Sequence, residues 1–290
     1  MIRAAPRVLG AAPRLIPATS RRCGRSRLVF VLAALALALS ACAMHGGGEG
    51  EPLVIAAASD LRPALPELEA LVAERTEEEP TVVVGSSGQL AQQLIEGSPM
   101  DVLASADRSY VDRVLEAGRG DPDTVATYAV GRLALWSPVQ AWGGWTDPGA
   151  LVADPDVTTI ALANPDHAPY GRAASEALAS SGNESLEGRL VYGENIADAQ
   201  RIGASGNADA VLTALPLAIA AGDDGRWNLV DDALHQPLQQ TLVVTADGDA
   251  RVARAQDVAD VLLSDEAGEI LRTYGLAPPG LDPPESWQEP

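Results

Sequence analysis

The 290-residue chain predicts an α/β fold in which mostly parallel sheets are flanked by helices. Short apolar runs alternate with segments whose apolar residues recur every three or four positions, as in strands followed by helices. The runs are continuously apolar, which is typical of parallel strands that are buried on both faces. An apolar content of 47% is enough for one large or two modest domains.

Three strand–helix units open the folded part of the chain. The predicted strands are residues 53–57, 81–84 and 102–105. The predicted helices that follow them are residues 61–72, 90–95 and 111–115. Gly97 and Gly118 come shortly after the second and third helices as stop signals. Three such units in succession predict a parallel sheet with helices on both faces.

A second series of elements follows. The strands predicted in it are residues 128–136, 158–163, 190–192, 210–213 and 240–246. The predicted helices are residues 171–180, 196–204, 253–263 and 266–274. Five prolines lie beyond residue 277, so the C-terminal end is predicted to be a non-helical tail.

The first 41 residues predict a lipoprotein signal peptide. Seven arginines and no acidic residue precede the apolar run 28–39, which is short for a membrane span but suits a signal-peptide core. The run ends at residues 39–42 (LSAC), which resemble the bacterial lipobox and imply cleavage before Cys42 with a lipid on its sulfur. A plain secretory signal with a bystander cysteine is the alternative. Residues 42–51 are Gly-rich and polar and predict a flexible tether.

The charge of the chain excludes several classes of function. All 20 basic residues are Arg, so a phosphate-loop lysine and a lysine Schiff base are excluded. Without the first 41 residues, the chain carries 13 Arg against 40 Asp and Glu, a formal charge of −27. A general nucleic-acid binder needs a positive surface, so that class is excluded as well.

Catalytic and metal motifs are incomplete in this sequence. Residues 85–89 (GSSGQ) approach a serine-hydrolase nucleophile elbow but lack its final Gly. The segments 121–123 and 247–249 start like calcium loops, yet both lack the Gly and Glu that complete them. His167 has no second ligand at metal spacing. We therefore predict no catalytic residue, no metal ligand and no cofactor.

Two loops at strand ends predict an anion site instead. Ser59 and Asp60 follow the first strand, and residues 85–88 (GSSG) follow the second. Each loop places hydroxyl groups and unpaired backbone N–H groups at the start of a helix, where anions bind. The alternative for each loop alone is ordinary helix capping. Two such loops on consecutive parallel strands favour a shared ligand at the carboxyl edge of the sheet.

Seven loop motifs in the same order resemble the molybdate-binding proteins of ABC importers. They are residues 56–60 (AAASD), 85–88 (GSSG), 101–107 (DVLASAD), 131–137 (GRLALWS), 163–171 (ANPDHAPYG), 191–196 (VYGENI) and 206–209 (GNAD). The resemblance covers about residues 53–275 and implies a two-lobe type II periplasmic binding protein fold with the ligand in the interlobe cleft. It implies a first lobe of residues 52–130 plus 240–290 and a second lobe of residues 131–239.

The resemblance also implies the ligand-binding positions. Ser59 and Ser87 match hydroxyl donors of the first lobe, and Tyr170 and Ile196 match backbone N–H donors of the second. Three further positions match less directly. Asp60 and Ala106 are expected to contribute their backbone amides. Ala214 stands where some members carry a tyrosine, so that hydroxyl contact is missing here.

The function that the resemblance implies is transport. The chain would be a monomeric lipoprotein, held through Cys42 on the outer face of the cytoplasmic membrane, that binds molybdate or tungstate and delivers it to a permease and an ATPase. A receptor for another oxyanion, phosphate or sulfate, is the first alternative, because an Asp60 carboxylate could accept the proton of hydrogen phosphate. Asp60 could instead cap the following helix and point away from the ligand. A surface sensor with the same fold is a further alternative.

Overall fold

The structure is a computed structural model that describes residues 50–182, 186, 188–279 and 287. These residues belong to a compact unit, Glu49–Pro290. The predicted signal peptide, the lipidated Cys42 and nearly all of the tether lie outside the described residues. Within the described part of the chain, every helix is too short or too polar to cross a membrane.

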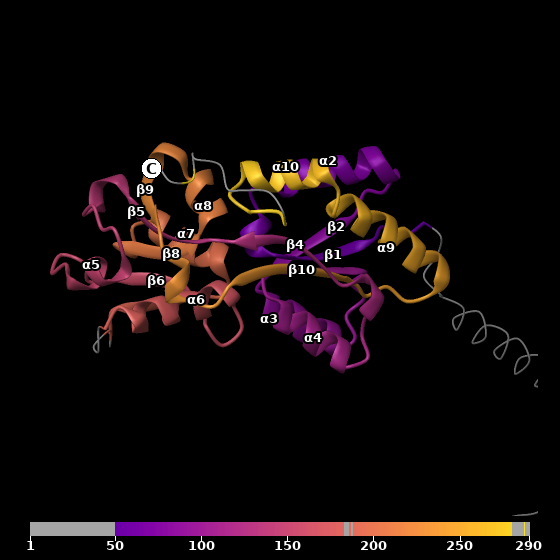
Figure 1. Cartoon of the computed structure of the whole chain (residues 1–290), viewed down its shortest axis with the longest axis horizontal. Helices are drawn as coiled ribbons and strands as arrows, with labels where there is room; N and C mark the ends of the chain where they lie inside the picture. Colours follow the sequence, from indigo (N-terminus) through magenta and orange to yellow (C-terminus); the bar gives the residue numbers. More distant parts are fainter. Residues whose placement is uncertain (1–49, 183–185, 187, 280–286, 288–290) are drawn as a thin grey trace, which may run out of the picture. The chain divides into compact units, whose positions relative to one another are not determined.

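The first lobe is built on a five-stranded sheet with the order β2-β1-β3-β10-β4 (Figure 1). Its strands are β1 (Val54–Ala58), β2 (Thr81–Gly85), β3 (Val102–Ser105), β4 (Ala126–Gly131) and β10 (Leu238–Val244). β1 pairs in parallel with β2 and β3, as the strand–helix units predict. β10 runs antiparallel to β3 and β4 and extends that parallel part.

Helices cover both faces of the first sheet, as Figure 1 shows. Their bounds are α2 (Leu65–Thr76), α3 (Ser87–Ile95), α4 (Arg108–Glu116), α9 (Asp249–Leu262) and α10 (Asp265–Thr273). The face under α3 and α4 holds one hydrophobic cluster, to which Leu90, Leu103 and Val111 belong. The opposite face under α2, α9 and α10 holds another, to which Ile55 and Leu68 belong. The sheet is therefore buried on both sides.

The second lobe is built on a sheet with the order β7-β6-β8-β5-β9. Its strands are β5 (Leu133–Pro138), β6 (Ile160–Ala163), β7 (Leu190–Gly193), β8 (Ala210–Ala214) and β9 (Gly225–Leu229). Its helices are α5 (Pro148–Ala153), α6 (Pro169–Ser180), α7 (Ile196–Ala204) and α8 (Leu215–Ala220). β6 pairs in parallel with β7 and β8, whereas β5 is antiparallel to β8 and β9.

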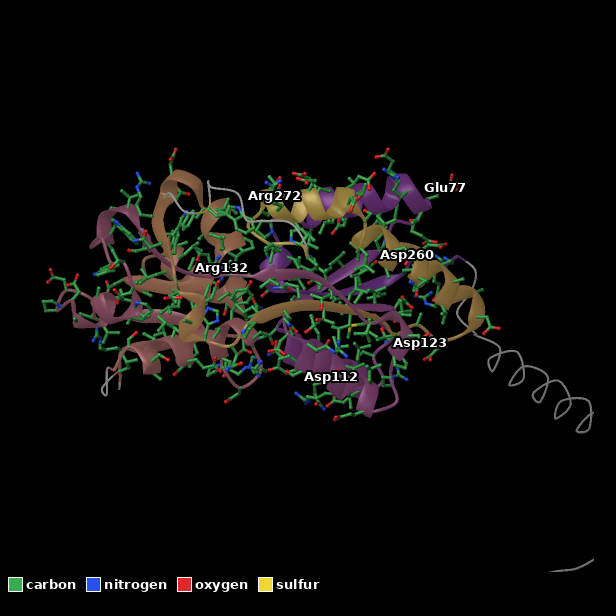
Figure 2. All side chains as sticks on the ribbon, in the orientation of Figure 1. Glu77, Asp112, Asp123, Arg132, Asp260 and Arg272 are labelled. Atoms are coloured by element: carbon green, nitrogen blue, oxygen red, sulfur yellow. The ribbon has the colours of Figure 1, made fainter. Side chains whose placement is uncertain are left out.

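The chain crosses between the two sheets twice. The predicted strand 128–136 is in fact two strands, because β4 ends at Gly131 in the first sheet and β5 begins at Leu133 in the second. Arg132, labelled in Figure 2, is the single residue between them, and its Nε lies 2.8 Å from Asp232 Oδ1. The return crossing leads into β10, whose Leu238 pairs with Gly131. The two crossings therefore lie side by side, which is the arrangement of a hinge.

Short 3₁₀ turns complete the described fold. They are η1 (Ser59–Leu61), η2 (Pro122–Thr124), η3 (Val139–Ala141), η4 (Gly222–Asp224) and η5 (Asp232–Leu234). The helix predicted to begin at residue 61 begins at Leu65 instead, because η1 precedes it. This difference matters for the site, because η1 positions Ser59 and Asp60 directly after the end of β1.

Candidate functional site

A small pocket lies where the two lobes meet, and all six residues predicted for the ligand site line it. Its volume is about 10 Å³, which is about the room that one water molecule needs. The lining residues are Ala58, Ser59, Asp60, Gly85, Ser86, Ser87, Ala106, Ala168, Pro169, Tyr170 and Ile196. The first lobe contributes Ala58 to Ala106, and the second lobe contributes the rest.

The two adjacent serines of the first lobe have different partners. Ser86 is the N-cap of α3, and its Oγ accepts the N–H of Gln89 at 3.4 Å. Ser87 is the first residue of α3, and its Oγ accepts the N–H of Ala106 at 2.9 Å. The hydroxyl hydrogen of Ser87 is not used in that bond, so Ser87 can donate it to a ligand. The Ala106 amide, in contrast, is directed to Ser87 in this structure.

The second lobe presents two helix N-termini to the pocket. Pro169 and Tyr170 are the first two residues of α6, and Ile196 is the first residue of α7. The first four N–H groups of a helix have no acceptor within the helix, and the helix dipole gives this end a partial positive charge. The N–H groups of Tyr170 and Ile196 are therefore available to an anion, which is the role that the sequence resemblance implies for them.

Cationic side chains do not line this pocket. Arg62 is exposed to solvent. Arg172 is paired across the lobes with Asp107, and it also lies over the Tyr110 ring, 5.8 Å from the ring centroid. The groups that can attract an anion in this pocket are therefore uncharged donors, namely serine hydroxyl groups and backbone N–H groups.

Asp60 is the central member of a buried hydrogen-bond network. Its carboxyl group is fully buried, and its Oδ2 accepts a hydrogen bond of 2.6 Å from Nε2 of Gln240. The same Nε2 lies 3.4 Å from the Tyr170 hydroxyl oxygen, and Oε1 of Gln240 accepts the Tyr128 hydroxyl at 3.0 Å. The network joins η1, β4 and β10 of the first lobe to α6 of the second.

Burial controls the protonation of this network. It raises the pKa of Asp60 from 3.8 to about 6, although the neighbouring polar groups of Tyr170, Gln240 and the local backbone lower it. Burial together with the charge of Asp60 raises the pKa of both Tyr128 and Tyr170 well above the usual value. Both tyrosines are therefore neutral donors at physiological pH.

The proposal that Asp60 caps the following helix is wrong. The N-cap of α2 is Ala64, which makes no side-chain capping bond, and Asp60 lies in the preceding turn η1. Its Oδ1 is buried and has no hydrogen-bond partner among the described residues. Gly131 leaves room for the Tyr170 hydroxyl beside Gln240 in this network, because a Cβ at position 131 would overlap that hydroxyl.

Contacts between the lobes close the pocket. The carbonyl oxygen of His167 accepts the N–H of Gly88 at 2.9 Å, and Nδ1 of His167 lies 2.9 Å from Ser86 Oγ. Nε2 of Gln89 donates to Glu194 at 2.9 Å. A Cβ on Gly88 would lie 2.5 Å from the His167 carbonyl oxygen, so only glycine allows this approach.

Sequence reasoning missed several of these residues. Gln240 and Tyr128 lie in strands and carry no motif, and the interlobe contacts of His167 depend on two loops that are far apart in the chain. Ala214 is buried at the end of β8, and an alanine there supplies no hydroxyl group to the site. In the described residues we find no group of three or more His, Cys, Asp or Glu side chains suited to a metal ion.

Comparisons with known proteins agree with this arrangement. A model of the family described as bacterial extracellular solute-binding protein matches residues 53–277. The chain is 36% identical over 255 residues to the molybdate-binding protein ModA of Rhodobacter capsulatus, a match that covers 88% of this chain and 95% of that protein.

Two solved structures have the same architecture. The periplasmic molybdate-binding protein of Azotobacter vinelandii superposes with a TM-score of 0.71 at 28% identity, over 78% of this chain and 99% of the other. The sulfate-binding protein SubI of Mycobacterium tuberculosis superposes with a TM-score of 0.66 at 15% identity, over 80% and 88% of the two chains. The second likeness concerns the fold alone. Together they confirm the predicted two-lobe α/β fold.

Proposed function

Because the chain belongs to the family of bacterial extracellular solute-binding proteins, which are not enzymes, we propose that it binds molybdate for an ABC importer. Ser59, Ser87, Tyr170 and Ile196 are the proposed donors to the anion, and Asp60 completes the wall of the site. Tungstate has the same shape and charge and is proposed as a second ligand.

One observation carries the proposal: the pocket converges hydroxyl and backbone donors from both lobes and contains no cationic side chain. Molybdate is a tetrahedral dianion with no proton at neutral pH, so each of its oxygens accepts hydrogen bonds and none donates. A cage of neutral donors at helix N-termini suits such an ion. Each hydrogen bond to the charged ion contributes about 1.5–3 kcal/mol before desolvation is subtracted.

The size of the cage supplies the proposed selectivity. Sulfate has the same charge and the same number of oxygens as molybdate but is smaller, so discrimination rests on the fit of the donors. The closed pocket holds about one water molecule, so a tetrahedral oxyanion requires the lobes to rotate slightly apart about the two crossings.

Hydrogen phosphate is the second candidate ligand, and Asp60 favours it. If the carboxyl is ionised, its unpartnered Oδ1 could accept the proton that hydrogen phosphate carries and molybdate lacks. In that case phosphate would bind at least as tightly as molybdate, and Asp60→Asn would weaken phosphate binding selectively.

The cellular setting is proposed from the N-terminal sequence and the relatives. Cys42 would carry the lipid that holds the protein on the outer face of the cytoplasmic membrane, and residues 42–51 would act as the tether. A monomer would deliver the anion to the permease and ATPase subunits of the importer. A role as a surface sensor is the alternative, and an importer operon beside the gene would favour transport.

The direct test is to measure how much molybdenum, bound as molybdate, each protein chain retains. The purified protein is equilibrated with molybdate, freed from unbound ion by gel filtration, and analysed for molybdenum by mass spectrometry. We expect one molybdenum per chain, and we expect Ser87→Ala to retain much less. A ratio near zero for the wild-type protein would contradict the proposal.

A further inference from the structure

Asp60, whose carboxyl group has no cationic partner, is one of the residues that line the proposed anion pocket. The residue is 0% exposed, and it lines the pocket together with Ser59 and Ser87. Gln240 occupies only Oδ2, which leaves Oδ1 buried and without a partner among the described residues. An unsatisfied buried oxygen costs free energy, so this atom requires an explanation.

The groups that face Asp60 do not neutralise a negative charge. Tyr128 of β4, Gln240 of β10 and Tyr170 of α6 are neutral donors. The charged residues of α7, Asp198 and Arg201, pair with each other at 2.5 Å and are partly or largely exposed.

The other elements near Asp60 add no buried cation. Helix α8, which also contacts η1, has the sequence LPLAIA and no charged residue. On the side of Asp60's own segment, the nearest arginine in sequence is Arg62, which is exposed. An ionised Asp60 would therefore stand uncompensated beside a bound dianion, and the two charges would repel each other strongly in a dry site.

We propose that Asp60 is protonated in the anion-bound state and donates its Oδ1 hydrogen to an oxygen of the anion. The proton comes from solvent and adds to Oδ1, the anion loses none, and binding therefore takes up one proton per anion. This inference rests on the proposed function. It makes Asp60 a ligand-binding residue through its side chain, beyond the amide contact expected from the sequence.

Burial prepares the carboxyl group for this role. The pKa of Asp60 is about 6 in the empty pocket, so the group is ionised at pH 8, and the bound dianion must raise the pKa to well above that pH for Asp60 to stay protonated. By linkage, the affinity should rise about tenfold for each pH unit between pH 8 and pH 7 and level off near pH 6.

Calorimetric titration with molybdate measures the proton uptake directly. The wild-type protein is titrated at pH 8 in two buffers with different ionisation enthalpies, and again at pH 5.5. We expect the uptake of about one proton per anion at pH 8 and well below one at pH 5.5. Asp60→Asn, which keeps the shape and offers an N–H donor, should bind without proton uptake and with an affinity independent of pH.

His167→Asn is the matched control, because the imidazole of His167 also lies at the cleft, where its Nδ1 is 2.9 Å from Ser86 Oγ. This variant should keep the proton uptake. Molybdate binding without uptake in the wild type, uptake that persists in Asp60→Asn, or uptake lost in His167→Asn would each overturn the inference. Absence of molybdate binding to the wild type would instead overturn the proposed function, and this inference with it.

Discussion

The Oγ of Ser86 lies 2.9 Å from Nδ1 of His167, a residue of the other lobe. The next residue, Ser87, directs its hydroxyl oxygen to the Ala106 amide of its own lobe. Both residues line the pocket, but their hydroxyl groups differ: that of Ser86 caps α3 and contacts the other lobe, whereas that of Ser87 donates to none of the described residues.

Ser87→Ala should weaken molybdate binding by about tenfold to a hundredfold, because it removes a hydrogen bond to a charged ligand worth about 1.5–3 kcal/mol. Ser86→Ala should weaken binding less and lower the stability by about 1 kcal/mol, because it removes the N-cap of α3. Titration and thermal melts of both variants test this. If Ser86 controls the affinity and Ser87 only the stability, the assignment within this loop is off by one residue.

Gly88→Ala should hold the lobes apart. The new Cβ would lie 2.5 Å from the His167 carbonyl oxygen and 2.8 Å from the Tyr110 ring, and backbone cannot yield as a flexible side chain does. We expect affinity for molybdate to fall on the order of tenfold or more, because a cleft held wider than the anion needs would keep the donors of one lobe away from an anion bound by the other. Gln92→Ala, on an exposed position of the same helix, is the control.

Small-angle scattering checks the closure itself. The wild-type profile should change when molybdate saturates the site, and the Gly88→Ala profile should change less. Identical wild-type profiles with and without molybdate would count against hinge motion at the two crossings.

Without any anion, Asp60 should make the stability depend on pH. Its pKa is about 6 in the folded protein against 3.8 in the unfolded chain, so between these values the folded state binds more protons. Its contribution is therefore fully present below pH 3.8, is lost as the pH rises to about 6, and amounts to about 3 kcal/mol.

Urea denaturation of Asp60→Asn and wild type isolates this contribution from the other carboxylates. The variant should be more stable than wild type at pH 7 by up to about 3 kcal/mol, and the gain should vanish near pH 3.5. A gain that is the same at both pH values would show that Asp60 does not titrate as its burial implies.

Cys42 should decide where the protein resides. The wild-type protein should fractionate with membranes and carry a lipid on its N-terminal cysteine in mass spectra, whereas Cys42→Ala should be released. An unmodified N-terminus in released wild-type protein would leave only an ordinary secretory signal.

The parallel part of each sheet could be predicted because its signals are local. The helix 196–204 has its observed bounds, since an Asn195 cap precedes a regular apolar spacing. Strand 102–105 is likewise correct, because four apolar or small residues lie between polar segments. The apolar pattern could not predict the break at Arg132, because apolar residues on both sides conceal the change of sheet.

Other elements were missed for related reasons. Helix α8 is apolar all round and shows no helical period, and helix α5 spans only six residues after Asp147. Strand β9 includes Arg226 and Asn228 and resembles a loop in sequence.

The candidate site divides in the same way. Ser59, Ser87, Tyr170 and Ile196 could be located because each starts or precedes a helix next to a recognisable loop motif. The partner of Asp60 could not, since Gln240 lies 180 residues away and reaches it only through the pairing of β10 with β3 and β4. Hydrogen bonds between distant elements leave no pattern in the local sequence.

Calorimetric titration of the purified protein with molybdate, tungstate, sulfate and phosphate tests the central claim most directly. A cage of neutral donors without Arg or His should bind molybdate and tungstate far more tightly than sulfate, with phosphate weakest because its proton finds no acceptor when Asp60 is protonated. Phosphate binding as tight as molybdate binding would contradict this account and make Asp60 an acceptor.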